Sequence, residues 1–136
     1  MLIPLDTAKG LMAMRWFNKH KQKEVWEDIN PIGDLEAARR IRDICNSAAS
    51  SAEKVRTGAA NKHETERYKR AAKIAMETAI KISDGLLRDA AVCQIVVLCV
   101  KANDLRTAAI LFRAVQAVST RKDMLNEHPA LRQAVA

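Results

Sequence analysis

The stretch from residue 61 to residue 118 constrains the fold most, because it reads as three consecutive helices joined by very short breaks. Apolar residues recur in it every three or four positions, which is the period of an amphipathic helix. Turn-forming residues interrupt the pattern at 83–85 and at 103–104. Since such short connections make neighbouring helices run antiparallel, we expect an up-down-up arrangement. The three expected helices cover 62–82, 84–102 and 104–118.

The start of the third helix is echoed 70 residues earlier in the chain. Residues 33–38 (GDLEAA) and 103–108 (NDLRTA) share a turn residue, an Asp, a Leu and an Ala at matching positions. That separation is about twice the length of a 34-residue helical hairpin, so the recurrence indicates stacked α-hairpins. Stacks of this kind mostly bind other macromolecules.

The composition predicts an all-α fold. Only 4% of the residues are aromatic, so the core must be built mainly from smaller aliphatic side chains, which favour helix-on-helix packing. Four glycines and three prolines are too few to separate many short strands. With 136 residues, the chain has the length of one domain with one core. We therefore predict a single all-α domain of antiparallel helical hairpins, arranged as a small bundle or a stack.

Local signals set the helix boundaries between the expected hairpins. Asp34 has the position of a helix cap, and we expect its helix to continue to about Arg56. Gly58 then takes the left-handed conformation that ends many helices. The alternative is a loop over 47–62, because clustered serines are unfavourable in helix interiors. Residues 61–64 have the form of a capping box, in which Asn and Glu satisfy each other's backbone groups.

The expected domain has three parts. Residues 1–30 form an N-terminal helical segment, residues 34–118 form the helical core, and residues 119–136 form a short helical tail. Within the tail, residues 120–123 resemble a helix start, and Pro129 interrupts the helix before a final short one.

The N-terminal segment combines large apolar residues with a cationic cluster at 19–23. This combination is typical of a helix that docks on a partner or lies on a membrane surface. Packing of the same face on the domain's own core, or across a homodimer, is the alternative that we favour, and a membrane surface is the least favoured partner. The residues expected to make a partner contact are Met12, Met14, Trp16, Phe17 and Trp26.

The net charge of +7 and the pI near 9.6 make nucleic acid the alternative partner. The cations are spread along the chain, since residues 1–62 hold 11 Lys/Arg against 8 Asp/Glu and residues 63–136 hold 12 against 8. No helix-turn-helix pattern accompanies them. The candidate phosphate contacts are Lys19, Lys21, Lys23, Arg39, Arg40, Arg42, Arg70 and Lys73.

No pattern in the sequence predicts a catalytic, metal-binding or cofactor-binding site. The three histidines, at 20, 63 and 128, lie far apart and lack neighbours at metal-ligand spacing. Four isolated glycines do not form a phosphate loop, and the serines at 47–51 have no base beside them. We therefore expect a protein that is not an enzyme and takes no cofactor.

The cysteines and the hydropathy pattern favour the cytoplasm. Cysteines at 45, 93 and 99 are odd in number and have no CxxC spacing, which suits a reducing compartment. No secretory signal opens the sequence. The longest apolar run, 90–100, has 11 residues and is too short to cross a bilayer.

One segment carries a resemblance to a known repeat. Residues 87–102 are Ala-rich and apolar, a turn of the form x-Ala-Asn-Asp follows at 101–104, and Ala108 precedes Phe112 by four positions. This order resembles a tetratricopeptide-like unit, and the resemblance is partial over 29–44. The chain lacks that motif's Trp and Tyr in the first helix and its closing Pro. The resemblance implies a right-handed stack with a concave protein-binding face.

These patterns together predict a non-catalytic protein–protein interaction module, an adaptor or scaffold built of α-hairpins. Its expected partner is another protein or a second copy of the chain. The alternative is a basic helical nucleic-acid-binding protein.

Overall fold

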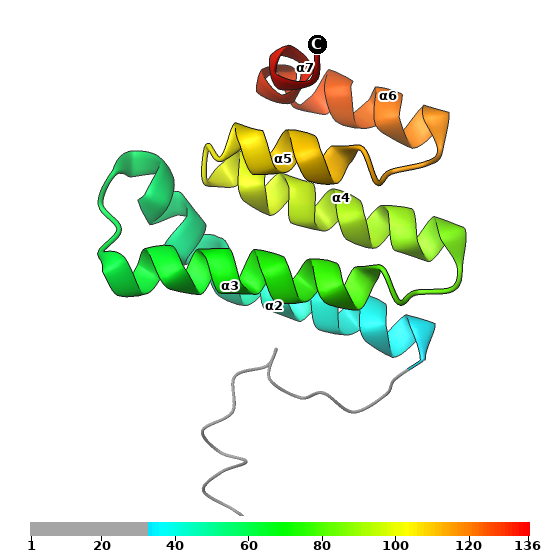
Figure 1. Ribbon diagram of the computed structural model, residues 1–136, viewed down its shortest axis with the longest axis horizontal. Coiled ribbons are helices and arrows are strands. Elements are labelled where there is room, and N and C mark those ends of the chain that lie inside the picture. The colour runs from blue at the N-terminus through cyan, green and yellow to red at the C-terminus, as the bar shows by residue number, and fades with distance from the viewer. Residues whose placement is uncertain (1–32) are drawn as a thin grey trace, which may run out of the picture.

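A computed structural model of the chain describes residues 33–136, which form helices and no strand (Figure 1). The predicted all-α class is therefore confirmed over this part of the chain. The N-terminal segment expected over residues 1–30 lies outside the described residues. The helices are α2 (Asp34–Thr57), α3 (Lys62–Ala79), α4 (Gly85–Lys101), α5 (Leu105–Phe112), α6 (Val118–Glu127) and α7 (Pro129–Val135).

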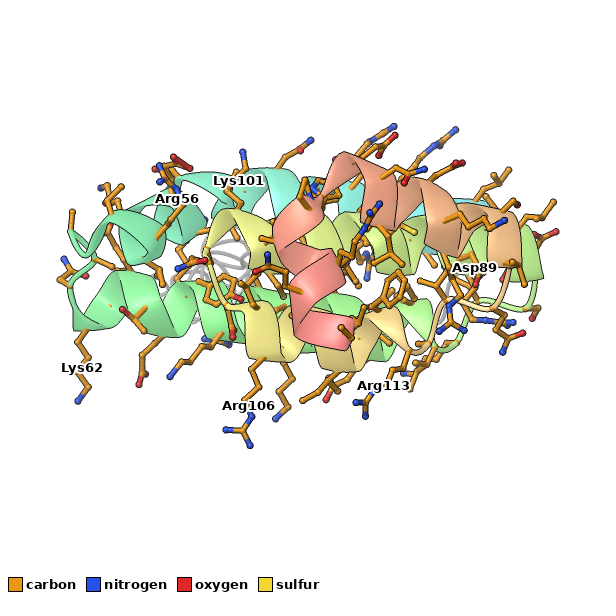
Figure 2. All side chains as sticks on the ribbon, turned by 90° about the horizontal axis from the view of Figure 1, so that it is seen from above. Arg56, Lys62, Asp89, Lys101, Arg106 and Arg113 are labelled. Atoms are coloured by element: carbon orange, nitrogen blue, oxygen red, sulfur yellow. The ribbon has the colours of Figure 1, made fainter. Side chains whose placement is uncertain are left out.

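The first four described helices form two antiparallel hairpins that stack on each other. Helices α2 and α3 form the first hairpin and α4 and α5 the second, while α6 lies beside α5 and α7 turns steeply across the end of the stack (Figure 1). Helix α4 is central, because it packs on α2, α3 and α5. Seen from above, α2 and α6 lie along one side of the molecule and α3 and α5 along the other (Figure 2). The up-down-up order of α3, α4 and α5 agrees with the sequence prediction.

Small aliphatic side chains build the core, as the low aromatic content predicts. Helix α4 is apolar on most of its circumference and buries Ile95, Val96 and Cys99 completely. On α3, one stripe at three- to four-residue spacing is buried, as the sequence pattern predicts. Its alanines have little side-chain volume, so α2 and α3 can pack closely along their length. The buried stripe consists of Tyr68, Ala71, Ala72, Ala75 and Ala79.

Helix α2 is one unbroken helix, so the expected continuation is confirmed and the alternative loop over 47–62 is wrong. It ends at Thr57, and Gly58 takes the left-handed conformation with φ of 79°. The predicted capping box is also present. The Glu64 backbone N–H donates to Asn61 Oδ1 at 2.8 Å, and the Asn61 N–H donates back to the Glu64 carboxylate.

The role predicted for Asp34 was wrong. Gly33 occupies the cap position of α2, and no side chain caps that helix end. The Asp34 carboxylate instead accepts hydrogen bonds from the backbone N–H groups of Ser83 and Asp84, at 3.0 and 2.9 Å. Asp34 therefore holds the connection into α4, while Asp84 caps α4 by accepting from the Leu87 N–H at 2.9 Å.

The third predicted helix was too long. Helix α5 ends at Phe112, and the next helix begins at Val118 rather than near 120–123. The buried Asp89 of α4 accepts from the Gln116 and Ala117 N–H groups, at 3.1 and 2.9 Å. Because these bonds satisfy the backbone ahead of α6, the chain can leave α5 early and turn into α6.

Asp34 and Asp89 play equivalent structural roles, because each carboxylate accepts hydrogen bonds from two backbone N–H groups. Each lies in the N-terminal part of the first helix of a hairpin, and each holds two successive N–H groups of the backbone that follows that hairpin. The carboxylates therefore join each hairpin to the next helix, α4 or α6, at the same end of the molecule (Figure 1). Among the described residues, no helix is both long and apolar enough to cross a membrane.

Candidate functional site

The proposed partner-binding residues of the N-terminal segment lie outside the described part of the chain. They are Met12, Met14, Trp16, Phe17 and Trp26. The same holds for the cations Lys19, Lys21 and Lys23.

The remaining candidate phosphate contacts are divided between two helices. Arg39, Arg40 and Arg42 belong to α2, and Arg39 forms an ion pair with Glu36 at 3.6 Å. Arg70 and Lys73 belong to α3. Arg42 lines a groove formed by α2, α4 and α6, whereas Lys73 lines a different groove, between α3 and α5. The fold therefore does not bring these cations together in one groove.

The groove between α3 and α5 is the first candidate site. Both helices pack on α4 and leave an open groove of about 440 Å³ between them. Its walls are mainly apolar, and Ile80 is an exposed large hydrophobic side chain. The groove is lined by Tyr68, Lys69, Ala72, Lys73, Met76, Glu77, Ile80, Asp104, Thr107 and Leu111.

A hydrogen-bonded group closes one end of this groove. The Tyr68 hydroxyl donates to Asp104 Oδ2 at 2.8 Å, and Asp104 Oδ1 accepts from the Thr107 N–H at 3.3 Å. Burial raises the pKa of Tyr68 well above its usual range, and the neighbouring Cys99 thiol and Asp104 carboxylate act in the same direction. The phenol is therefore a fixed hydrogen-bond donor at neutral pH, and it ties α3 to the start of α5.

Cations border the groove. Lys69 and Lys73 lie in its wall, and within residues 33–136 neither of them has an ion pair. Helix α5 contains no acidic residue, and it carries Arg106 and is followed by Arg113. Lys62, Arg106 and Arg113 project from the α3/α5 side of the molecule (Figure 2). The groove thus has an apolar floor, and Lys69 and Lys73 with the nearby Arg106 and Arg113 form a basic border on this side of the molecule. Two carboxylates, those of Glu77 and Asp104, also belong to the lining.

A second groove lies between α2, α4 and α6 and has a volume of about 420 Å³. Its lining is more polar, with Asn46, Gln94 and Lys101 beside Cys45 and Cys93. Burial raises the pKa of Cys45 to about 12 and that of Cys93 to about 11. Because a thiol must ionise to act as a nucleophile or a metal ligand, these two cysteines are not activated for either role at neutral pH. In the part of the chain that the structure describes, no group of three or more His, Cys, Asp or Glu could hold a metal ion.

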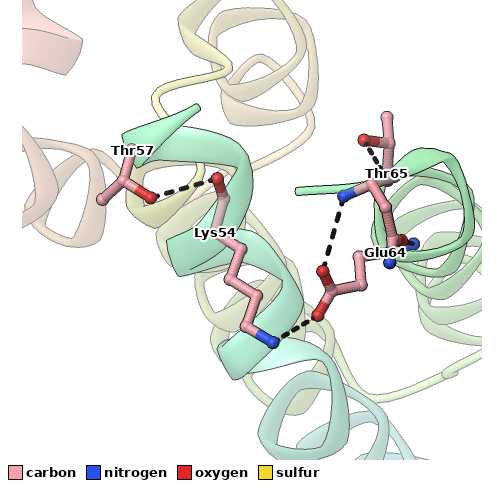
Figure 3. Close-up of polar contacts among 5 residues, drawn as sticks. Lys54, Thr57, Glu64 and Thr65 are labelled. Atoms are coloured by element: carbon pink, nitrogen blue, oxygen red, sulfur yellow. Dashed lines mark hydrogen bonds and ion pairs between the residues drawn. The ribbon is translucent and has the colours of Figure 1, made fainter. Parts of the chain in front are cut away.

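The loop between α2 and α3 is fixed by polar contacts of its own (Figure 3). The Lys54 ammonium group pairs with the Glu64 carboxylate at 2.6 Å, and the Thr57 hydroxyl donates to the Lys54 carbonyl at 3.2 Å. The hydrogen bond from Lys54 lowers the pKa of Glu64. Glu64 also belongs to the capping box of α3, so these contacts explain the hairpin turn and form no separate site.

Neither groove is predicted by the sequence patterns. The α3 pattern identifies the buried alanine stripe, but Met76 and Ile80 lie beside that stripe and become groove walls only when α5 is in place. Leu111 continues the apolar spacing of the helix predicted over 104–118, and it is half-buried in the same groove. The pairing of these residues is a property of the stack, and one helix at a time does not reveal it.

Comparisons with known proteins found no match to this chain. No protein-family model matches the chain, and neither a curated protein nor a solved structure shows significant similarity to it. The groove between α3 and α5 and its basic border are therefore the main structural basis for a functional proposal.

Proposed function

We propose that this chain is a non-catalytic protein–protein interaction module, and that it binds a segment of another protein in the groove between α3 and α5. The observation that carries the proposal is the open, mainly apolar groove of about 440 Å³ on this side of the stack. Grooves between helices are common binding sites for partner helices, which insert apolar side chains at helical spacing.

The chemistry of the groove suits a protein ligand. Met76 adapts its shape to different side chains, and Ile80 and Leu111 provide branched apolar surface on the two opposing helices. The Ile80 side chain is 63% exposed in the folded chain. A partner that covers it would bury this apolar surface, which favours binding. Stacked helical hairpins present such extended surfaces to macromolecular partners. The tetratricopeptide-like resemblance of residues 87–112 supports the same class of function.

The proposal is tested by a pull-down with the tagged full-length chain from a lysate of its source cells, with and without nuclease. The wild type is compared with Ile80→Gln, which removes apolar surface from the groove, and with Val118→Gln. Val118 is 69% exposed and does not line the groove, so its variant is a matched control. We expect a discrete protein partner that survives nuclease, is lost from Ile80→Gln and is retained by Val118→Gln.

Two results would contradict the proposal. Equal recovery by both variants would show that the partner binds elsewhere on the chain. Recovery of nucleic acid in place of a protein, with loss at high salt, would favour the nucleic-acid alternative, because phosphate contacts are strongly salt-dependent.

A further inference from the structure

Resting on the proposed function, we infer that the groove between α3 and α5 takes an acidic amphipathic helix of the partner protein. The length of the groove sets the length of the partner helix that can contact it. Its α3 wall runs from Lys69 to Ile80, which is about 16 Å at the helical rise. A partner helix lying along this wall would make contact over about three turns. Apolar anchors at positions i, i+4, i+7 and i+11 would span about 16 Å and would therefore fill the groove.

The cations at the border of the groove favour a partner helix with negative charge. Lys69 and Lys73 lie in the wall, one helical turn apart, without an ion pair among the described residues. Arg106 and Arg113 project from the same side of the molecule (Figure 2). Carboxylates on the flanks of a bound helix would meet these cations, and complementary charges of this kind speed association and exclude wrong partners.

Two acidic residues also line the groove. Asp104 is bonded to the Tyr68 hydroxyl and the Thr107 N–H at the end where Lys69 lies. Glu77 lies towards the other end, near Ile80. The partner's carboxylates therefore belong beside Lys69 and Lys73, and its apolar anchors belong over the apolar floor.

Two candidate ligands for the groove belong to this protein itself, and the charge of each makes it a poor match for the basic border. Residues 1–23 contain five Lys/Arg and one Asp, so that segment would bring a net charge of +4 to a basic border. A second copy docked over the groove would bring the same surface with its own Lys69 and Lys73, so it would not supply the excess of carboxylates that the basic border favours.

Nucleic acid fits the floor of the groove poorly. Single strands bind by stacking their bases on aromatic side chains. Tyr68 is the aromatic residue in the lining, but it is 2% exposed and its hydroxyl is bonded to Asp104. The floor offers Met76 and Leu111 instead, which suit aliphatic anchors.

The test selects ligands without assuming their sequence. A phage-displayed library of random peptides, about 16 residues or roughly four helical turns long, is panned against the full-length chain. The enriched peptides are synthesised and titrated by fluorescence anisotropy against the wild type and the variants. We expect enrichment of net-negative sequences with apolar residues at helical spacing.

Three variants of the groove are compared with one control. Lys69→Glu/Lys73→Glu should weaken binding by roughly tenfold or more, because it replaces attraction by repulsion at two positions. Glu77→Gln should strengthen binding by roughly two- to threefold, since it removes a like charge. Ile80→Gln should weaken binding through lost apolar contact. The control Arg39→Glu/Lys122→Glu changes the net charge equally at residues outside the groove and should leave binding nearly unchanged.

The possible outcomes separate the two proposals. Neutral or basic peptides that lose binding in Ile80→Gln would overturn the acidic partner and leave the groove as a protein-binding site. Peptides that bind all variants equally, or a library that yields no binder, would overturn the groove itself. Binding of single-stranded DNA of about 20 nucleotides that is lost in Lys69→Glu/Lys73→Glu would assign the basic border to nucleic acid instead.

Discussion

At the scale of single residues, the fold depends on where small side chains lie. Ala108 of α5 is completely buried, and Phe112 one turn later is 2% exposed with the Arg121 guanidinium 5.3 Å from its ring centre. The sequence pattern places both residues correctly on the buried face of their helix. It places Leu86 and Val118 on buried faces too, but both are exposed. Both lie in the first turn of a helix, where neighbouring helices of the stack do not cover them.

Ala108→Leu tests the close contact at the buried face of α5. The larger side chain has no space at a fully buried position, so we expect the free energy of unfolding to fall by roughly 1–3 kcal/mol. Urea denaturation followed by circular dichroism measures the change. Ala90→Leu, at an exposed position of α4, is the control and should have little effect. An unchanged midpoint for Ala108→Leu would show that α5 does not pack closely at this point.

The buried thiols make stability depend on pH in the alkaline range. Burial raises the pKa of Cys93 and Cys99 from 9.0 to about 11, so the folded state holds these protons more tightly than the unfolded state does. The thiols' contribution to stability is complete below the unfolded value near 9.0 and is lost as the pH rises towards about 11.

Urea denaturation at about pH 8 and about pH 10.5, with a reductant present, measures this loss. Because burial also raises the pKa of Tyr68, the informative quantity is the comparison with Cys93→Ala/Cys99→Ala. We expect the variant to lose less stability than the wild type between the two pH values. Equal losses in both proteins would mean that the thiols are not shielded from water.

At the scale of helices, caps within one helix were predictable and caps between helices were not. The Asn61 box and the Asp84 cap use partners three residues away, so the sequence encodes them locally. Asp34 and Asp89 reach N–H groups 49–50 and 27–28 residues away. That separation explains why the sequence predicts a local cap at Asp34, and why it predicts an end of α5 at residue 118, which is too late.

Asp89→Asn tests the joint between the second hairpin and α6. The amide keeps one acceptor and puts an NH₂ group against a backbone N–H, so one of the two bonds to Gln116 and Ala117 is lost in a buried place. We expect a loss of roughly 1–3 kcal/mol in the free energy of unfolding by urea denaturation. Asp123→Asn, at an exposed position of α6, should change it little. Equal stabilities for the two variants would argue that the Asp89 carboxylate is dispensable.

At the scale of the whole molecule, stacking creates the surface that carries the functional proposal. The class of the fold, the hairpin order and most helix bounds follow from hydrophobic spacing and turn residues. The groove depends on how far α3 stands from α5 across α4, and that distance is set by side-chain volumes on three helices together. The positions of the charged residues in the groove also depend on stacking. The sequence predicts Lys73 as a phosphate contact together with Arg70, but only the assembled structure shows that Lys73 lines the groove beside Met76.

Hydrogen–deuterium exchange of the full-length chain, with and without the partner recovered by pull-down, tests the central claim most directly. A partner seated in the groove should slow exchange in the two segments that form its walls, residues 69–80 of α3 with its end and residues 104–111 around α5. Exchange over residues 42–49 of α2, which border the second groove, should stay the same. Protection confined to residues 42–49, or to residues outside both grooves, would contradict the assignment of the α3/α5 groove as the binding site.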